Sequence, residues 1–367
     1  MATTQKIVSD HGIGCQGLAH LPSGKRLQGA GDARHRSAMC TGVHEQTDNT
    51  ADSVPCDRLQ KIVCLVGPTA VGKTALSLEI AHAFSCEIVS VDSMQVYRYM
   101  DIGTAKPTPE EQRQVRHHCI DLVDPATAYN TACFVRNAEQ AVAEIRGRGC
   151  LPLFTGGTGL YMKAFKEGLF ELPVKIPGTI RKKLCQEMDG VGSAAMHARL
   201  AVVDPASSTR IHPNDSQRIL RGLEIYEASG TPWSHWIKKQ KNTDKQRVKN
   251  DILTIGLHID REILGKRIEM RTRQMIDHGF IQEVKDLLAK GYPLTLSSMQ
   301  SIGYRHVGQY LTGRVSLQDA LAAMATDTKR YAKRQFTWFQ RDKDIIWIEH
   351  KKKELIFDCI ASFLKTT

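Results

Sequence analysis

The chain has 367 residues, a formal net charge of +11 and ten cysteines without a C-x-x-C pair. This length allows two or three domains, and no apolar run approaches the roughly 20 residues of a membrane span. The cysteine pattern argues against a zinc module or a disulfide framework, and it favours a reducing, cytoplasmic location. The basic excess favours a polyanionic partner.

Residues 1–57 differ from the rest of the chain because they are rich in Gly, Ser, Thr, His and Asp and show little hydrophobic periodicity. Acidic residues such as Asp10, Asp32 and Glu45 fit a transit peptide poorly. We therefore expect a flexible N-terminal extension, to which we assign no function.

A glycine-rich segment reads G-x-x-x-x-G-K-T and consists of Gly67, Pro68, Thr69, Ala70, Val71, Gly72, Lys73 and Thr74. An apolar run at 62–66 precedes it and an amphipathic segment from about 75 to 84 follows, an order that predicts strand, turn and helix. This order is typical of a phosphate-binding loop, in which backbone N–H groups and a helix N-terminus bind phosphate. Lys73 can then reach a terminal phosphate, and Thr74 can bind Mg²⁺. The motif predicts a ligand with at least two linked phosphates, either a nucleotide such as ATP or another diphosphate.

A second predicted strand, at 87–91, ends at Asp92, Ser93, Met94 and Gln95. Polar groups just past the carboxyl end of a strand face the ligand crevice of an open α/β sheet. Asp92 is therefore a candidate for chemistry. Capping of a helix N-terminus is an equally compatible role.

A third predicted strand, at 151–154, follows a predicted helix at 134–145 and runs into T-G-G-T-G at 155–159. Such a turn alone is a weak signal, because glycines also let a helix pack closely on a strand. Two glycine-rich turns at strand ends favour a shared anion site.

The chain between 173 and 250 becomes helical and charged, and a strand pattern returns at 252–257. We therefore predict an α/β fold with a parallel-sheet core similar to P-loop NTPases, formed by 58–172 and 251–350, and a helical domain inserted at 173–250. Helical patterns continue from 258 to the C-terminus, with a final helix in 351–367. In the insert, Arg218 and Arg221 share a helix face, as an anion clamp or as a solvated basic edge.

The stretch from 328 to 341 interleaves cations with aromatic residues. Phosphate contacts and base stacking both require that composition, so it favours a nucleic-acid surface. The alternative is an amphipathic helix with Phe336 and Trp338 partly in the core.

Seven blocks of the sequence, in order, resemble the tRNA dimethylallyltransferases of the bacterial type, also called tRNA isopentenyltransferases. The blocks are GPTAVGKT at 67–74, SVDSMQVY at 90–97, DIGTAKP at 101–107, FTGGTGLY at 154–161, NDSQRILRGLEI at 214–225, SIGYR at 301–305 and KRQFTW at 333–338. They span about residues 61 to 348.

The resemblance implies transfer of a dimethylallyl group from dimethylallyl diphosphate to N6 of the adenosine immediately 3′ of the anticodon in tRNA. The phosphate loop would then bind a prenyl diphosphate with Mg²⁺ instead of ATP. Asp92 would accept a proton from the attacking amine. Lys73, Thr74 and Arg218 or Arg221 would stabilise the charge that develops on the leaving diphosphate.

The resemblance also implies a tRNA-binding set. Thr69, Thr158 and Arg181 would contact substrate, and the extruded base would lie among Asp92, Ser93, Met94, Gln95, Gln217, Arg218, Ile219, Leu220 and Arg221. The anticodon-loop backbone would bind Gln300, Ser301, Ile302, Gly303, Tyr304, Arg305, Lys333, Arg334, Gln335, Phe336, Thr337, Trp338, Phe339 and Gln340. The helical insert would clasp the anticodon stem-loop, and a monomer suffices for one tRNA and one site.

Three other functions share part of this pattern. A small-molecule kinase has the phosphate loop but does not need the basic-aromatic block. A prenyltransferase acting on free AMP or ADP shares nearly all the chemistry, but the long insert and the charge favour a macromolecular acceptor. An RNA-binding module without activity does not need Lys73, Thr74 and Asp92 together.

Overall fold

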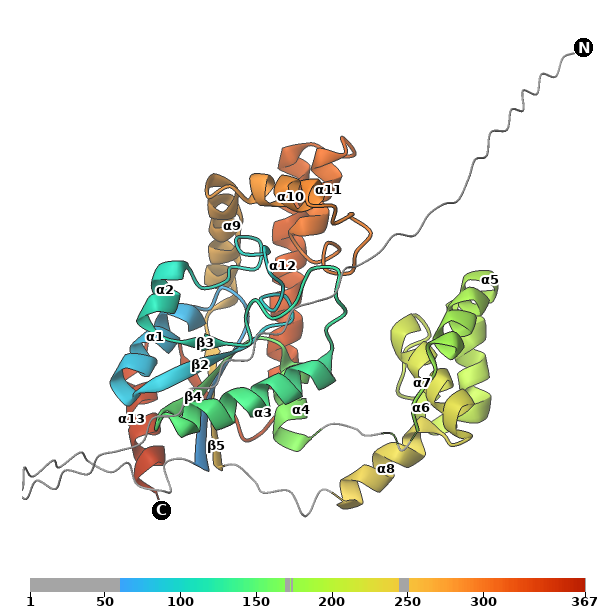
Figure 1. Ribbon diagram of the computed structural model, residues 1–367, viewed down its shortest axis with the longest axis horizontal. Coiled ribbons are helices and arrows are strands. Elements are labelled where there is room, and N and C mark those ends of the chain that lie inside the picture. The colour runs from blue at the N-terminus through green and yellow to red at the C-terminus, as the bar shows by residue number, and fades with distance from the viewer. Residues whose placement is uncertain (1–59, 169–171, 173, 244–250, 367) are drawn as a thin grey trace, which may run out of the picture. The chain divides into compact units, whose positions relative to one another are not determined.

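The computed structural model describes residues 60–168, 172, 174–243 and 251–366 (Figure 1). The predicted N-terminal extension, 1–57, lies outside the described residues. So do Pro173, at the predicted start of the insert, and 244–250 at its end. None of the helices in the described ranges has the length and apolar character needed to cross a membrane.

Within the described residues the strands form one six-stranded sheet in the order β3-β2-β4-β1-β5-β6. Their bounds are Lys61–Val66 (β1), Cys86–Val91 (β2), His117–His118 (β3), Leu151–Gly156 (β4), Asp251–His258 (β5) and Ile346–Glu349 (β6). All pairs are parallel. This confirms the predicted α/β class.

Helices cover both faces of this sheet. One face packs on α3 (Thr131–Gly147) and α4 (Gly159–Glu167), and the other packs on α1 (Lys73–Phe84) and α13 (Lys353–Lys365). A short helix, α2 (Pro109–Gln114), lies in the segment between β2 and β3. The layers follow from the sequence because a parallel strand buried on both faces must be apolar at successive positions.

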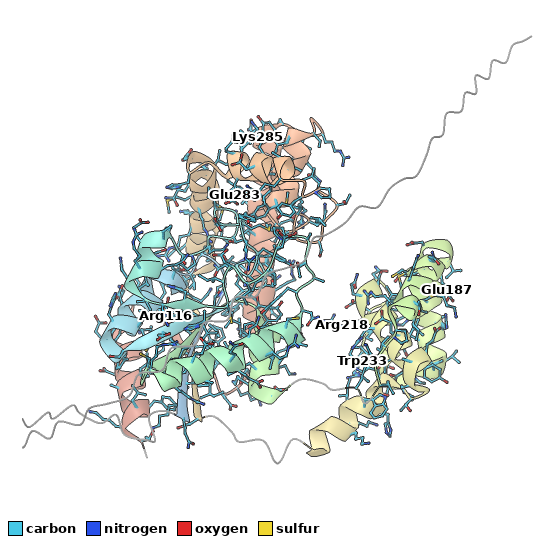
Figure 2. All side chains as sticks on the ribbon, viewed as in Figure 1. Arg116, Glu187, Arg218, Trp233, Glu283 and Lys285 are labelled. Atoms are coloured by element: carbon cyan, nitrogen blue, oxygen red, sulfur yellow. The ribbon has the colours of Figure 1, made fainter. Side chains whose placement is uncertain are left out.

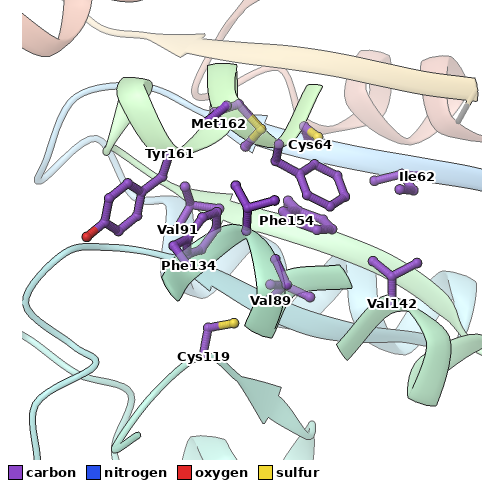
Figure 3. Close-up of a cluster of buried hydrophobic side chains, with 14 of the residues drawn as sticks. Ile62, Cys64, Val89, Val91, Cys119, Phe134, Val142, Phe154, Tyr161 and Met162 are labelled. Carbon is purple, nitrogen blue, oxygen red and sulfur yellow. The ribbon is translucent and has the colours of Figure 1, made fainter. Parts of the chain in front are cut away.

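Strand β1 shows this two-sided burial directly. All six of its residues are buried. Ile62 and Cys64 point into the cluster beneath α3 and α4, whereas Val63 and Leu65 point into the cluster beneath α1 and α13. Figure 3 shows the first cluster, in which Phe134 of α3 lies among the side chains of β1, β2 and β4.

A second group of helices follows β5: α9 (Arg261–Asp277), α10 (Phe280–Ala289), α11 (Tyr304–Leu311) and α12 (Leu317–Phe339). Their shared core contains Phe280, Val284, Tyr304 and Met324. It also includes Met100 from the loop that follows β2. This group therefore packs directly on the chain that leaves the second strand of the sheet.

The helices between α4 and β5 have a core of their own. They are α5 (Gly178–Val203), α6 (Pro205–Ser208), α7 (Ser216–Ser229) and α8 (Trp233–Thr243). Leu184, Leu200, Ile219 and Leu223 form its centre, with Trp233 against its edge. Figure 2 shows Trp233 and Arg218 within this group of helices. The division into a core and an inserted domain stays a prediction.

The structure corrects the expectation that only helices follow residue 258. Residues 346–349 form β6, which extends the sheet beside β5. The sequence Ile-Trp-Ile-Glu is too short to show a strand period against the helical pattern around it. The predicted C-terminal helix is present as α13, up to Lys365.

Gly156, at the end of β4, lies where β4 approaches β2 so closely that a side chain has no room. A Cβ at this position would lie 2.2 Å from the Val91 carbonyl oxygen of β2. Because that atom belongs to the backbone, it cannot move aside. We expect Gly156→Ala to lower the free energy of unfolding by at least about 2 kcal/mol, measured by urea denaturation.

Gly147, the last residue of α3, is the matched control because no atom lies within 4 Å of a Cβ placed there. Gly147→Ala is expected to raise the free energy of unfolding by roughly 0.5 kcal/mol, through a less flexible unfolded chain. Equal effects of the two substitutions would contradict the proposed strand contact.

Candidate active site

The carboxyl ends of β1, β2 and β4 meet at one edge of the sheet. The phosphate loop follows β1, Asp92 follows β2, and the second glycine-rich turn follows β4. One polar cavity is lined by Lys73 and Thr74 of the loop, by Asp92, and by Thr155 and Gly157 of the turn. The parallel topology therefore brings together three segments that the sequence analysis could relate only by strand order.

Two glycines give the phosphate loop its shape. Gly67 has φ 147° and approaches Leu257 of β5 so closely that a Cβ would lie 2.8 Å from the Leu257 carbonyl oxygen. Gly72 has φ 108° at the N-cap of α1, a conformation open mainly to glycine. Lys73 follows as the first residue of α1. Its Nζ donates to the carbonyls of Gly67 at 3.0 Å and Pro68 at 2.8 Å.

Helix α9 supplies two cations that the sequence analysis did not single out. Arg271 donates from Nη1 to Thr69 Oγ1 at 3.2 Å, and Arg267 donates from Nη1 to the Val71 carbonyl at 3.1 Å. The two arginines are four residues apart and therefore lie on one helix face. That spacing was the available signal, but several other basic pairs in this chain have a similar spacing.

The charges at this edge influence one another. Burial, and then the positive charge of Arg271, lower the pKa of Lys73 to about 7, although Asp92 acts to raise it. Burial also lowers the pKa of Arg271, and Asp92 again opposes the change. Two cations that lie close together and partly shielded from water attract a ligand with several negative charges.

Asp92 has one oxygen engaged with its own loop. Oδ1 accepts from the backbone N–H of Met94 at 2.8 Å and of Gln95 at 3.4 Å. No helix begins there, since α2 is the next helix described after β2. The helix-capping alternative is therefore replaced by a local turn. The carboxylate lines both the polar cavity and a second, neighbouring cavity.

The second cavity is mainly apolar and measures about 270 Å³. Its apolar wall comes from Ile268, Met275, Ile302 and Met324, and Ser93 and Met94 lie at its edge. Thr69, Ala70, Asp92, Thr104, Arg271 and Tyr331 line both cavities. The site can thus accept a ligand with an anionic end and an apolar end, joined beside Asp92.

The second glycine-rich turn is shaped by its contacts with α12. A Cβ at Gly157 would meet the Gln335 side chain, and one at Gly159 would lie 2.1 Å from Trp338. Thr158 occupies the N-cap position of α4 without a side-chain capping bond, and its N–H donates to the Val91 carbonyl at 3.1 Å. Close packing therefore explains these glycines, while Thr155 and Gly157 also line the polar cavity.

Gln335 connects this turn to the phosphate loop. Its Oε1 accepts from the Thr69 N–H at 2.8 Å, and its Nε2 donates to the Gly157 carbonyl at 3.0 Å. Beside it, burial raises the pKa of Tyr331 to about 12, so that this phenol stays protonated. The buried Gln335 therefore supports the loop instead of offering its amide to RNA.

The rest of the block at 333–340 divides by helix face. Phe339 is buried, Phe336 packs edge-on against Trp347, and Trp338 is partly buried. The side chains that stay exposed are those of Lys333, Arg334, Thr337 and Gln340. The structure thus buries the aromatic residues wholly or partly, as in the amphipathic alternative, and RNA contact by the exposed polar members stays a prediction.

The segment from 300 to 305 is also mainly internal. Tyr304 is fully buried and Gly303 is buried, whereas Gln300 is exposed. Ser301 donates to the Ser298 carbonyl, and Arg305 pairs with Asp327. Ile302 lines the apolar cavity. Gly303 and Tyr304 thus lie below the surface, and contact of this segment with RNA stays a prediction.

The predicted residues of the helical insert gather on α5 and α7. The carboxylate of Glu224, itself 2% exposed, pairs with Arg181 at 2.6 Å and with Arg221 at 3.3 Å. Arg181 also donates to Gln217 at 2.7 Å, and Arg218 pairs with Asp215. Ile219 and Leu220 are buried in the core of this unit. The arginines are partly exposed ion-pair members, and their role toward diphosphate stays a prediction.

Comparisons with known proteins agree with this geometry. A family model described as IPP transferase matches residues 95–342, and one described as isopentenyl transferase matches 60–123. A tRNA dimethylallyltransferase of Desulfotalea psychrophila is 46% identical over 306 residues, which cover 83% of this chain and 96% of the relative. The enzyme of the same name from Geobacter metallireducens is 45% identical over 305 residues, 82% and 96% of the two chains.

The chain belongs to the tRNA dimethylallyltransferase family.

Solved structures related to this family include the full-length tRNA isopentenylpyrophosphate transferase of Bacillus halodurans. It is 38% identical, with a TM-score of 0.61 over 83% of this chain and 97% of that one. A eukaryotic dimethylallyltransferase acting on tRNA is 27% identical, with a TM-score of 0.65 over 82% and 76% of the two chains. Family membership confirms the resemblance carried by the seven sequence blocks.

In this member of the tRNA dimethylallyltransferase family, the low pKa of Lys73 predicts that binding of inorganic diphosphate takes up a proton. At about pH 8 the free amine is largely neutral, and a bound anion restores the charged form. Calorimetry in two buffers of different ionisation enthalpy should show uptake of up to about one proton, and affinity should fall as the pH rises above about 7.

Lys73→Arg is the control, because a guanidinium stays charged throughout this range. The diphosphate itself titrates equally in both experiments, so the difference between the proteins isolates Lys73. The same proton uptake in both proteins would contradict a lowered pKa for this lysine.

Proposed function

We propose that this protein transfers a dimethylallyl group from dimethylallyl diphosphate to N6 of the adenosine immediately 3′ of the anticodon in tRNA. The observation that carries the proposal is the pair of adjoining cavities that meet at Asp92. The polar one suits a diphosphate and the apolar one suits a short prenyl chain. An ordinary nucleotide would leave the apolar cavity unexplained.

The phosphate loop and the cations around it bind the leaving group in this proposal. Backbone N–H groups at the start of α1, Lys73 and Arg271 would bind diphosphate oxygens. Negative charge grows on the diphosphate as the carbon–oxygen bond breaks, so fixed positive charge lowers the barrier. Thr155 Oγ1, buried and without a hydrogen-bond partner within the described part of the chain, lines the same cavity and has hydrogen-bonding capacity to spare.

The residues present fit a magnesium ion held mainly by the substrate. Thr74 is exposed at the cavity and offers a hydroxyl oxygen, the hard type of ligand that Mg²⁺ prefers. Among the described residues no three acidic, His or Cys side chains form a metal cluster. Diphosphate oxygens and water would complete the coordination, and the ion would neutralise charge on the leaving group.

Asp92 would act on the acceptor. Its position on the wall of both cavities puts it beside the point where the prenyl carbon and the amine must meet. The exocyclic amine becomes acidic as it bonds to carbon, and a carboxylate within hydrogen-bond reach can then accept its proton. Geometry thus matters more than the basicity of the free carboxylate.

The target base must leave the stack of the anticodon loop to reach this site. The exposed Lys333, Arg334, Thr337 and Gln340, with the exposed Gln300, could then bind the loop backbone. The helical insert would clasp the stem-loop as a separate domain, with the partly exposed Arg181, Arg218 and Arg221 facing RNA or diphosphate. Gln95 is a poorer candidate for reading the base, because its amide already binds Ser90 and the carbonyl of Ala105. One chain offers one complete site, which supports a monomer.

The reaction can be tested with labelled dimethylallyl diphosphate, Mg²⁺ and either an unmodified anticodon stem-loop with A-rich neighbours or free AMP. Label on the stem-loop alone is the expected result. Label on AMP would assign the protein to prenylation of free nucleotides. Label on neither acceptor would contradict the proposed function.

The base role predicts that Asp92→Asn lowers kcat by about a hundredfold or more while the dissociation constants of stem-loop and diphosphate stay within about threefold. Asparagine keeps an oxygen that can accept from Met94, so the turn is retained. Asp286→Asn, which neutralises an exposed carboxylate on α10 outside both cavities, serves as the control and should keep most activity. Unchanged single-turnover transfer in Asp92→Asn would rule out this role.

A further inference from the structure

A tight turn formed by 101–105 lines the site together with the phosphate loop. Gly103 and Thr104 line the apolar cavity, and Thr104 and Ala105 line the polar one. The turn closes on itself through bonds from the Ala105 N–H to the Ile102 carbonyl and from the Lys106 N–H to the Asp101 carbonyl, both 3.0 Å. Its position therefore helps to set the width of both cavities.

One carboxylate on α10 binds three successive backbone amides of this turn. Glu283 accepts from the N–H groups of Asp101 at 3.0 Å and Ile102 at 2.6 Å through Oε2, and of Gly103 at 3.1 Å through Oε1. Consecutive amides that point to one place form an anion-binding concavity. Here the occupant is a side chain of the protein itself. Figure 2 labels Glu283 on its helix.

A fourth donor, from a side chain, also binds the Glu283 carboxylate. The hydroxyl of the fully buried Tyr304 donates to Glu283 Oε1 at 2.6 Å. Burial, and then the negative charge of Glu283, hold the pKa of Tyr304 well above its usual range, so the phenol remains a donor. Gly103 packs against the rings of Phe280 and Tyr304, since a Cβ there would lie 2.2 Å from Phe280.

The same pair of helices also reaches the phosphate loop. Arg267 and Arg271 of helix α9 donate hydrogen bonds to that loop. Helix α10 begins three residues after α9 ends. The helix pair α9–α10 thus contacts both the phosphate loop and the 101–105 turn. We propose that Glu283 is a positioning residue that holds the 101–105 turn against the prenyl chain and so sets the affinity for the prenyl end of the substrate.

This inference rests on the proposed function for the identity of the prenyl ligand, but its test needs no transfer to RNA. Calorimetry would compare dimethylallyl diphosphate with inorganic diphosphate on wild-type protein and Glu283→Gln. The amide of glutamine offers one acceptor oxygen in place of two, and its NH₂ group would oppose a backbone donor.

We expect Glu283→Gln to weaken the binding of dimethylallyl diphosphate by about tenfold and the binding of inorganic diphosphate by less than about threefold. The anionic end should lose less affinity, because Lys73 and Arg271 are held by the phosphate loop and make no hydrogen bond to the turn. In turnover the same change should appear as a raised KM for dimethylallyl diphosphate. Glu283→Asp keeps both oxygens and should recover part of the affinity.

Asp286→Asn is the matched control, because Asp286 is an exposed carboxylate on the same helix. It should leave both dissociation constants unchanged. Tyr304→Phe removes only one donor to Glu283. If the two side chains act together, Glu283→Gln should lower the affinity for dimethylallyl diphosphate less in the Tyr304→Phe background than in the wild type. Melting temperatures of all variants would show which remain folded at the assay temperature.

An equal loss of affinity for both ligands in Glu283→Gln would mean general damage to the site and would overturn the proposal. A lower melting temperature with both affinities unchanged would reduce Glu283 to a stabilising residue. Failure of the wild type to label any acceptor would instead contradict the proposed function, and the difference between the two ligands would still report on the turn.

Discussion

The concentration of positive charge at the carboxyl edge of the sheet is the constraint on which the rest of the structure depends. Lys73 and Arg271 influence each other in a partly buried place, and Asp92 is the opposing charge that acts on both. Such an arrangement costs free energy in the absence of an anion, because like charges repel and both are poorly hydrated. It therefore requires a rigid frame to keep the groups together.

Several buried contacts supply that frame. The strands of the sheet fix the ends of three segments, and Gln335 ties two of them through paired bonds of 2.8 and 3.0 Å. Lys106, buried in the loop after β2, binds the Tyr97 carbonyl and the carboxylates of Asp101 and Asp121. These groups touch no reacting atom, but they decide where the groups that do will lie.

The sequence predicted the parts of this site that follow from local rules. A glycine-rich loop between strand and helix, and an aspartate after the next strand, are encoded by short patterns, and the parallel topology places them at one edge. The contributions of Arg271 and Glu283 could not be predicted in this way, because they come from helices about 200 residues further along the chain. Their helices show only ordinary amphipathic spacing.

The basic-aromatic block shows a different limit. Composition favoured RNA contact for the whole stretch, but helical periodicity divides it, so that Phe339 and Gln335 turn inward while Lys333 and Arg334 face solvent. In the same way, Tyr304 belongs to a block that identifies the family, yet it lies in the core. A family motif thus mixes residues that meet the substrate with residues that support them.

The place of Gln335 on α12 has a consequence for how the protein can change over evolution. Successive residues of one helix turn carry exposed cations on one side and, on the other, the Gln335 bridge between the phosphate loop and the second glycine-rich turn. The exposed positions can vary without disturbing that bridge. A change that shifts the axis of the helix would also displace the Thr69 amide. The surface of this helix can therefore change one side chain at a time, while the position of its backbone is constrained by the bridge that Gln335 makes.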